Sequence, residues 1–342
     1  MSASSGAGER AAAIAAFLAR AGWADAEPRP LAGDASFRRY LRLSRAGGTA
    51  ILMDAPPPME DVRPFVRIAG LLRRLGLTAP RILAHAPRRG LVLEEDIGDD
   101  TFAALLDRGS DPETLFAAAV DVLIHLRQRT TAKQLATLPA FDVPRLVEEA
   151  ALLTDWFLPA WTGSATAPEL RADYLARWTA VLGRAPLGPP TLVLRDYFAS
   201  NLIWLPDRDG VRRCGLLDFQ DAVAGPAAYD LVSLLEDVRR DIPEELGALM
   251  YQRYLDRAGI DDRDGFAHAY AVLGAQRNLR IAGVFARLDR RDGKAHYLPF
   301  MDRVWALVDH DLRHPALVPI REWLDRHVPA AWRGRPPSRA AA

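Results

Sequence analysis

The alternation of apolar and polar side chains predicts a strand-rich first part of the chain. Four runs have the apolar content or the period near two that is typical of strands: residues 37–43, 50–53, 81–84 and 91–94. The glycines at 47 and 48 and the Pro87-to-Gly90 segment are turn signals between neighbouring runs. With the extended run that begins at Arg29, these segments predict an antiparallel five-stranded sheet.

Helical spacing of apolar side chains marks most of the remaining chain. Residues 60–75 place their apolar side chains on one face, and Gly76 follows as a stop signal. Further helical patterns cover residues 11–19, 115–129, 143–158 and 168–182 and most of the chain from residue 229 onward. We therefore expect an α+β fold in which a sheet with one helix precedes a mainly helical region.

Residues 191–218 interrupt the helical pattern and carry the polar residues of greatest interest. Three short strands are predicted at 191–194, 201–205 and 214–217, with a hairpin turn at 206–210. Asp196 follows the first strand, Asn201 opens the second, and Asp218 follows the third. An Asp-x-x-x-x-Asn loop followed, after a strand pair, by another Asp is the spacing of the protein-kinase catalytic loop.

Phosphoryl transfer requires the residue types found at these three positions. The reaction needs an acceptor for the proton of the attacking hydroxyl and oxygen ligands for Mg²⁺. We therefore predict Asp196 as the catalytic base, and Asn201 and Asp218 as the Mg²⁺ ligands.

Composition limits the classes of partner and the chemistry of the site. The 342 residues are 49% hydrophobic, and 44 Lys plus Arg balance 44 Asp plus Glu, which argues against nucleic acid as a partner. The single Cys214 allows no intramolecular disulfide, and no signal peptide or membrane-spanning run is predicted, so we expect a cytoplasmic protein. Lys133 and Lys294 are the only lysines.

The loop Leu194 to Asn201, with Leu217-Asp218-Phe219-Gln220-Asp221, resembles the aminoglycoside phosphotransferase and choline kinase superfamily. Residues 33–40, 53–57, 216–222 and 228–231 are most similar to its bacterial anomeric N-acetylmuramate and N-acetylglucosamine kinases. The resemblance implies a bilobal protein-kinase-like fold, with a nucleotide-binding lobe at 1–97, a hinge near 94–98, and a helical lobe at 98–342. It also implies ATP- and Mg²⁺-dependent phosphorylation of the C1 hydroxyl of these sugars in peptidoglycan recycling.

The nucleotide site implied by the resemblance departs from the family pattern. Leu194 replaces the usual His of the catalytic loop, and the strand position of the phosphate-binding lysine falls near Leu52 or Met53. We expect an arginine, Arg38 or Arg39, to neutralise the phosphates instead. Gly33 and Ser36 stand where the phosphate-covering loop is expected. Glu95 and Ile97 belong to the linker whose backbone would meet the adenine, and the carboxylates of that linker are expected to be solvated.

For the sugar, the resemblance points to the helical lobe. The residues that we expect to contact it, with Asp196, are Gln220, Asp221, Tyr229, Arg277 and Trp156. Arg277 would meet the lactyl carboxylate of a muramate, and Trp156 would stack on the sugar face. Two alternatives stay open: the same transfer to another small hydroxyl compound, such as an aminoglycoside or choline, or a kinase-like protein that binds without catalysis. The sequence gives no signal for the oligomeric state.

Overall fold

The computed structural model describes residues 2–31 and 38–338, and the chain forms two compact units. The first unit combines Met1–Ala118 with Ser200–Asp221, and the second combines Ala119–Ala199 with Ala222–Ala342. The segment 200–221 thus joins the unit built by the first part of the sequence. The predicted lobes, 1–97 and 98–342, divide the chain differently, because their boundary comes from the resemblance to kinases and not from the compactness of the units. The lobe boundary stays a prediction.

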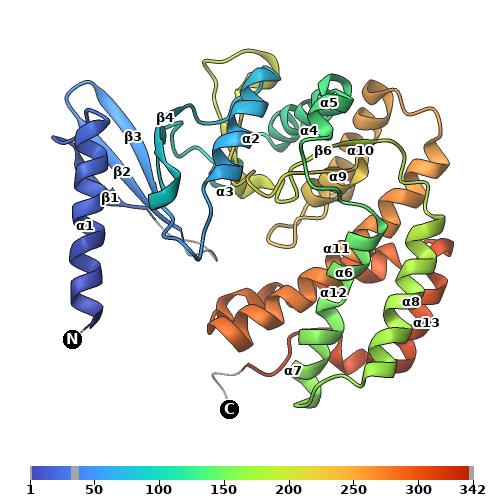
Figure 1. The fold of residues 1–342 in the computed structure, drawn as a ribbon. Helices are drawn as coiled ribbons and strands as arrows, with labels where there is room; N and C mark the ends of the chain where they lie inside the picture. The colour runs from blue at the N-terminus through green and yellow to red at the C-terminus, as the bar shows by residue number, and fades with distance from the viewer. Residues whose placement is uncertain (1, 32–37, 339–342) are drawn as a thin grey trace. The chain divides into compact units, whose positions relative to one another are not determined.

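A five-stranded antiparallel sheet forms the centre of the first unit (Figure 1). Its strands are β1 (Glu27–Pro30), β2 (Arg39–Arg45), β3 (Gly48–Asp54), β4 (Ile82–Ala86) and β5 (Leu91–Glu95). Their order in space is β1-β2-β3-β5-β4, so both predicted hairpins lie in the sheet side by side. The predicted α+β architecture, with the sheet first and helices after it, is confirmed.

The two faces of the sheet have different neighbours. One face packs against α1 (Ser2–Arg20), where Phe17 and Leu18 form a core with strand residues such as Leu52 and Leu93. Each large apolar side chain buried in this way contributes about 1.5–3 kcal/mol to folding. Because side chains alternate along a strand, Ile51 and its neighbours on adjacent strands project from the opposite face.

The rest of the first unit packs beside this sheet. Its elements are α2 (Arg63–Arg74), α3 (Phe102–Asp107), β7 (Leu202–Trp204) and β8 (Cys214–Leu216). The β7–β8 hairpin joins the earlier chain through bridges from Gly215 to Thr78 and from Ile203 to Thr101. The helix expected at 60–75 begins only at Arg63, because Pro64 fits the first turn and leaves Glu60 in the preceding segment.

The second unit is mainly helical. Its helices are α4 (Pro112–Arg129, entered from the first unit), α5 (Ala132–Leu135), α6 (Val143–Ala150), α7 (Leu158–Thr162), α8 (Pro168–Arg184), α9 (Ala228–Leu235), α10 (Glu244–Ala258), α11 (Arg263–Asp292), α12 (Met301–Asp311) and α13 (Val318–His327). A two-stranded ribbon pairs β6 (Pro190–Val193) with β9 (Val223–Pro226). Within residues 2–31 and 38–338, no helix is both long and apolar enough to cross a membrane.

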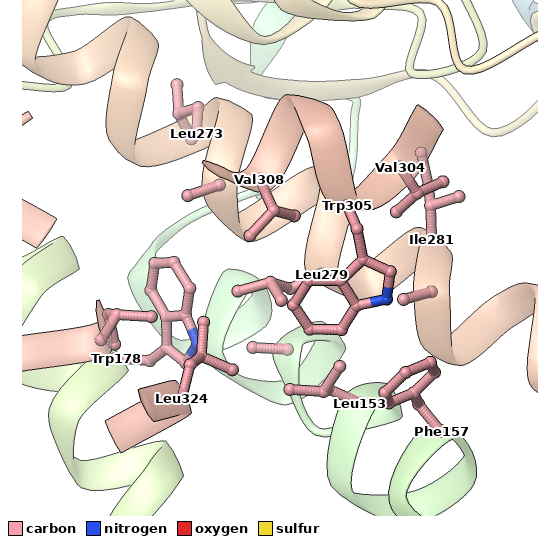
Figure 2. Packing of buried hydrophobic residues seen from close by; sticks show 14 of the residues in the cluster. Leu153, Phe157, Trp178, Leu273, Leu279, Ile281, Val304, Trp305, Val308 and Leu324 are labelled. Carbon is pink, nitrogen blue, oxygen red and sulfur yellow. The ribbon is translucent and has the colours of Figure 1, made fainter. Parts of the chain in front are cut away.

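The core of the second unit forms around α11 (Figure 2). The rings of Phe157 and Trp305 lie 5.3 Å apart, and Leu153 and Leu279 pack beside them. Leu153 to Phe157 form a π-helical turn inside the segment predicted as one helix over 143–158. A Cβ at Gly283 of α11 would lie 2.2 Å from the carbonyl oxygen of Leu152, so glycine there permits the close packing of α11 on this turn.

Candidate active site

A cavity of about 640 Å³ in the first unit brings seven of the predicted site residues together. Its wall includes strand residues from the face of the sheet opposite α1, and residues of the 200–221 segment. The predicted residues in its wall are Arg38, Glu95, Ile97, Asn201, Asp218, Gln220 and Asp221. Residues more than 100 positions apart in the sequence thus line one cavity, and Asp196 is not among them.

Asp218 is held at the cavity by its neighbours in the sequence. Phe219 is fully buried and its ring stacks on Phe65 of α2, with centroids 4.8 Å apart. The Nε2 atom of Gln220 donates to the Oδ1 atom of Asp218 at 2.9 Å. Asp218 itself has a φ of 53°, in the left-handed region that few non-glycine residues adopt. The buried phenylalanine therefore fixes a strained backbone that presents the carboxylate to the cavity.

Arg38 is the arginine that faces Asp218. Its Nε atom donates to Glu60 Oε2 at 3.1 Å, and its Nη1 atom lies 3.5 Å from Asp218 Oδ1. Burial lowers the pKa of Arg38, but its interactions with Tyr40, Glu60 and Asp218 outweigh burial and raise it. Among the described residues that line the cavity there is no lysine. A guanidinium thus takes the position next to the predicted metal ligand.

The second arginine candidate lies elsewhere. Arg39, one residue further along β2, points to the other face of the sheet and pairs with Asp54 at 2.5 Å. Asp54 also accepts hydrogen bonds from Arg10 of α1. Arg39 does not line the cavity that contains Asp218. The alternation of side chains in β2 accounts for the separation of these two neighbours.

The donors at this cavity fit a magnesium ion. Asp218 supplies a carboxylate and Asn201 an amide oxygen, both hard ligands of the kind that Mg²⁺ prefers. The Oε1 atom of Gln220 is buried there and receives no hydrogen bond from the residues that the structure describes. Among the described residues, no three His, Cys, Asp or Glu side chains lie together as a metal site built from these residue types alone would need.

The linker that follows β5 lines the same cavity, and its charges are mostly paired. Asp96 and Asp99 both bind the guanidinium of Arg42, and Glu95 accepts from Arg208 at 3.1 Å. The expectation that the linker carboxylates are solvated is wrong for Glu94, which is 5% exposed. Burial raises its pKa to about 8.

Apolar side chains complete the cavity wall beside the linker. They are Ile51, Ile97, Ile203 and Leu217. A wall of this kind suits a flat, weakly polar ring, while the charged groups of Arg38 and Asp218 suit phosphates and a metal. Gly33 and Ser36, which were predicted to cover the phosphates, lie outside the described residues.

Asp196 lies in the second unit, in a loop fixed by a buried carboxylate. Asp230 of α9 accepts hydrogen bonds from the backbone N–H of Leu194 at 2.6 Å and of Arg195 at 2.8 Å. Arg195 has a φ of 73°, and its guanidinium donates to Glu149 at 2.6 Å. Burial raises the pKa of Asp230 to about 7. Asp230 therefore positions the backbone that carries Asp196.

The three sugar-site candidates from the helical region also lie in the second unit. Tyr229 is buried on α9 and meets the ring of Phe141 edge-on at 4.9 Å. Arg277 is 3% exposed and donates to Ser233 Oγ at 2.9 Å, so a sugar contact would require it to change partners. Trp156 is half-buried in the π-helical turn. Their roles stay predictions.

Sequence reasoning missed two residues of these sites. Glu94 was grouped with a solvated linker because Glu95 and Asp96 follow it directly; the only signal for burial was its place in the predicted strand 91–94. Asp230 was not among the predicted site residues. Its partners are backbone N–H groups 35 and 36 residues earlier, which no local pattern could have indicated.

The chain is similar to proteins of one known family over most of its length. The model of the phosphotransferase enzyme family matches residues 27–269. A Caulobacter vibrioides protein named N-acetylmuramate/N-acetylglucosamine kinase is 38% identical, over 95% of this chain and 98% of its own length. A Pseudomonas aeruginosa protein of the same name is also 38% identical, over 89% of this chain and 90% of its own.

Solved structures show the same fold at low identity. Aminoglycoside 2′-phosphotransferase-IIIa, solved with GDP, superposes with a TM-score of 0.55 at 14% identity, over 83% of this chain and 92% of that one. Choline kinase from Cryptosporidium parvum superposes with a TM-score of 0.59 at 13% identity, over 94% of this chain and 99% of that one. The fold is therefore the protein-kinase-like fold of these enzymes. With the family match and the cavity that contains Asn201 and Asp218, this chain belongs to the phosphotransferase enzyme family.

Proposed function

We propose that the protein is a sugar kinase that transfers the γ-phosphoryl group of ATP to the anomeric hydroxyl of N-acetylmuramate and N-acetylglucosamine. The observation that carries the proposal is the cavity in which Arg38, Asn201 and Asp218 come together. The substrates follow from the relatives that carry this name at 38% identity over nearly the whole chain. The proposal includes a cytoplasmic role in the recycling of peptidoglycan sugars.

One end of the cavity is suited to the nucleotide base, and the other end is suited to the phosphates. The apolar residues Ile51 and Ile97 would hold the adenine, and Arg38 would contact the phosphate oxygens as a charged hydrogen-bond donor. Asn201 and Asp218 would hold Mg²⁺, which would neutralise charge on the phosphates when bound. Glu60 keeps the guanidinium of Arg38 in place.

Asp196 would act on the sugar. The anomeric oxygen forms a bond to the γ-phosphorus, the bond from that phosphorus to the bridging oxygen of ADP breaks, and the hydroxyl proton passes to the Asp196 carboxylate. An anomeric hydroxyl is more acidic than an ordinary alcohol, so the base needs little driving force and contributes mainly by orienting the oxygen. The hydrogen bonds from Leu194 and Arg195 to Asp230 hold the loop for this task.

A coupled assay of ADP release tests the proposal. Purified protein with Mg-ATP should release ADP when N-acetylmuramate or N-acetylglucosamine is added, and not with the 1-O-methyl glycoside of N-acetylglucosamine, whose anomeric hydroxyl is blocked. The Asp196→Asn variant should be slower by about 10²-fold or more, because the amide can neither take up the hydroxyl proton nor orient the anomeric oxygen as the carboxylate does. Turnover with kanamycin or choline, and none with either sugar, would instead assign the phosphotransfer to another acceptor.

A further inference from the structure

Glu94 is a buried carboxyl group in the cavity wall to which the phosphotransfer itself gives no role. It is 5% exposed, and it lines the cavity with Arg38 and Asp218. Its Oε2 atom is buried and accepts no hydrogen bond from any residue in the described ranges. Buried polar atoms without a partner are rare because desolvation makes them unfavourable. An atom of a bound ligand is the simplest partner for this oxygen.

The sheet register places Glu94 beside the base end of the cavity. Leu91 and Leu93 of β5 pack in the core under α1, so Glu94 projects from the opposite face of the strand. Its direct partner across the β3–β5 register is Ile51, which also lines the cavity. The carboxyl group thus lies next to an apolar side chain that would pack on a nucleotide base.

The protonation state of Glu94 decides which atoms it can pair with. Burial is the cause that raises its pKa, to about 8. Tyr40 on β2 interacts electrostatically with it, and burial also raises the pKa of Tyr40, so the phenol is neutral. Near pH 7 Glu94 is therefore mostly protonated and offers one O–H donor and one carbonyl acceptor.

The two purine bases present different edges to such a group. Adenine carries an amino donor at N6 beside an acceptor at N7, whereas guanine carries two acceptors, O6 and N7. The O–H of a protonated carboxyl group can donate to N7 of adenine while its carbonyl oxygen accepts from the N6 amino group. Guanine would place O6 against the carbonyl oxygen of Glu94 and leave two acceptors facing each other in a buried site.

We propose that Glu94 determines the choice of nucleotide: its protonated carboxyl group donates to N7 of adenine, accepts from the N6 amino group, and thereby selects ATP over GTP. This inference rests on the proposed function, because it requires that the cavity bind the nucleotide. It assigns the orphaned Oε2 atom a partner and gives a reason for a buried acid that directly follows the apolar residues of β5.

Binding of Mg-ATP and Mg-GTP to the full chain, measured by titration calorimetry, tests the inference with two matched variants. Glu94→Gln keeps a donor and an acceptor in the same shape, so the preference for ATP should stay within about threefold of the original. Glu94→Met keeps the length and loses both groups. The original protein should prefer ATP by about 10- to 100-fold, the discrimination typical of a bidentate base contact, and the Met variant by less than about threefold.

The outcomes separate this inference from the proposed function. A Met variant that keeps the original preference overturns the role of Glu94, and so does a Gln variant that loses the preference, since the paired group would then be a carboxylate. Equal binding of ATP and GTP by the original protein overturns the inference and leaves the phosphotransfer intact. Binding of neither nucleotide overturns both. Glu94→Leu repeats the apolar test if the Met variant fails to fold.

Discussion

The Nη1 atom of Arg38 lies 3.5 Å from the Oδ1 atom of Asp218, at the cavity that also contains Asn201. Glu60 binds the other side of the same guanidinium. An arginine directly before β2 thus stands beside the predicted metal ligand, in a chain whose β3 carries no lysine. This arrangement offers a cation for phosphate oxygens from a different strand than the family pattern uses.

Removal of the Arg38 guanidinium should weaken both nucleotide binding and turnover. In the Arg38→Ala variant we expect the KM for ATP to rise and kcat to fall, each by about tenfold or more, because a charged contact to the phosphates is lost. Arg38→Lys should recover part of the loss. Steady-state kinetics give both constants.

Arg39→Ala is the matched control, since Arg39 is the next residue and points away from the cavity. It should leave both constants within about twofold. Equal losses in the two alanine variants would show that Arg38 has no special contact with ATP.

Asp218 should govern the dependence of the reaction on magnesium. Asp218→Asn removes a charged ligand, so the Mg²⁺ concentration for half-maximal rate should rise and kcat should fall by about 10²-fold or more. Chelation of the metal should stop the original enzyme. Asp209→Asn, an 89% exposed carboxylate between β7 and β8, serves as the control. If the magnesium dependence of Asp218→Asn equals that of the control, Asp218 is not a metal ligand.

Asp230 should act on catalysis through the loop that carries Asp196. Asp230→Asn keeps the size of the side chain but sets an amide N–H against one of the two backbone N–H donors. We expect a loss of about 1–3 kcal/mol in the free energy of unfolding and a kcat at least about tenfold lower.

The KM for ATP should not change in this variant, because Asp230 is not among the residues that line the cavity. Denaturant unfolding and steady-state kinetics check both parts. A variant with lower stability and an unchanged kcat would limit Asp230 to a structural role.

Glu94 should make the protein less stable as the pH rises. Its pKa is about 8 in the folded chain against an ordinary value of 4.5, so the folded state binds the proton more tightly than the unfolded state. Stability from this group is complete below about pH 4.5 and is lost as the pH rises to about 8, by at most about 1.4 kcal/mol per pH unit.

Glu94→Gln cannot titrate, so the unfolding free energy of the variant should fall less steeply over this range. Urea unfolding at several pH values measures the difference. Parallel curves for the two proteins would mean that Glu94 is ionised in the folded chain as in the unfolded one.

Local patterns predicted the sheet and most helices because short apolar runs are typical of buried strands and helical spacing is typical of helices with one buried face. The strand at 50–53 and the hairpin around residues 87–90 are observed as β3 and the β4–β5 pair. The break after Ala150 was not predictable from local pattern, since the π-helical turn directly follows the close contact of Leu152 with Gly283 of α11, more than 100 residues away in the sequence.

The candidate site could be predicted where its residues form a spaced motif. Asn201 and Asp218 do line one cavity, as expected from their spacing. The choice between Arg38 and Arg39 depended on where β2 begins, since Arg39 pairs with Asp54 in the sheet register and Arg38 lies directly before the strand. The burial of Glu94 depended on packing across three strands, which the sequence of β5 alone does not contain.

The identity of the product tests the central claim most directly. Purified protein would be incubated with Mg-ATP and N-acetylmuramate, and the product examined by phosphorus–proton correlation NMR. The account predicts a sugar phosphate whose phosphorus couples to the anomeric proton, and none with the Asp196→Asn variant. Phosphorus coupled to any other sugar proton, or ATP consumption equal to that of the Asp196→Asn variant, would contradict it.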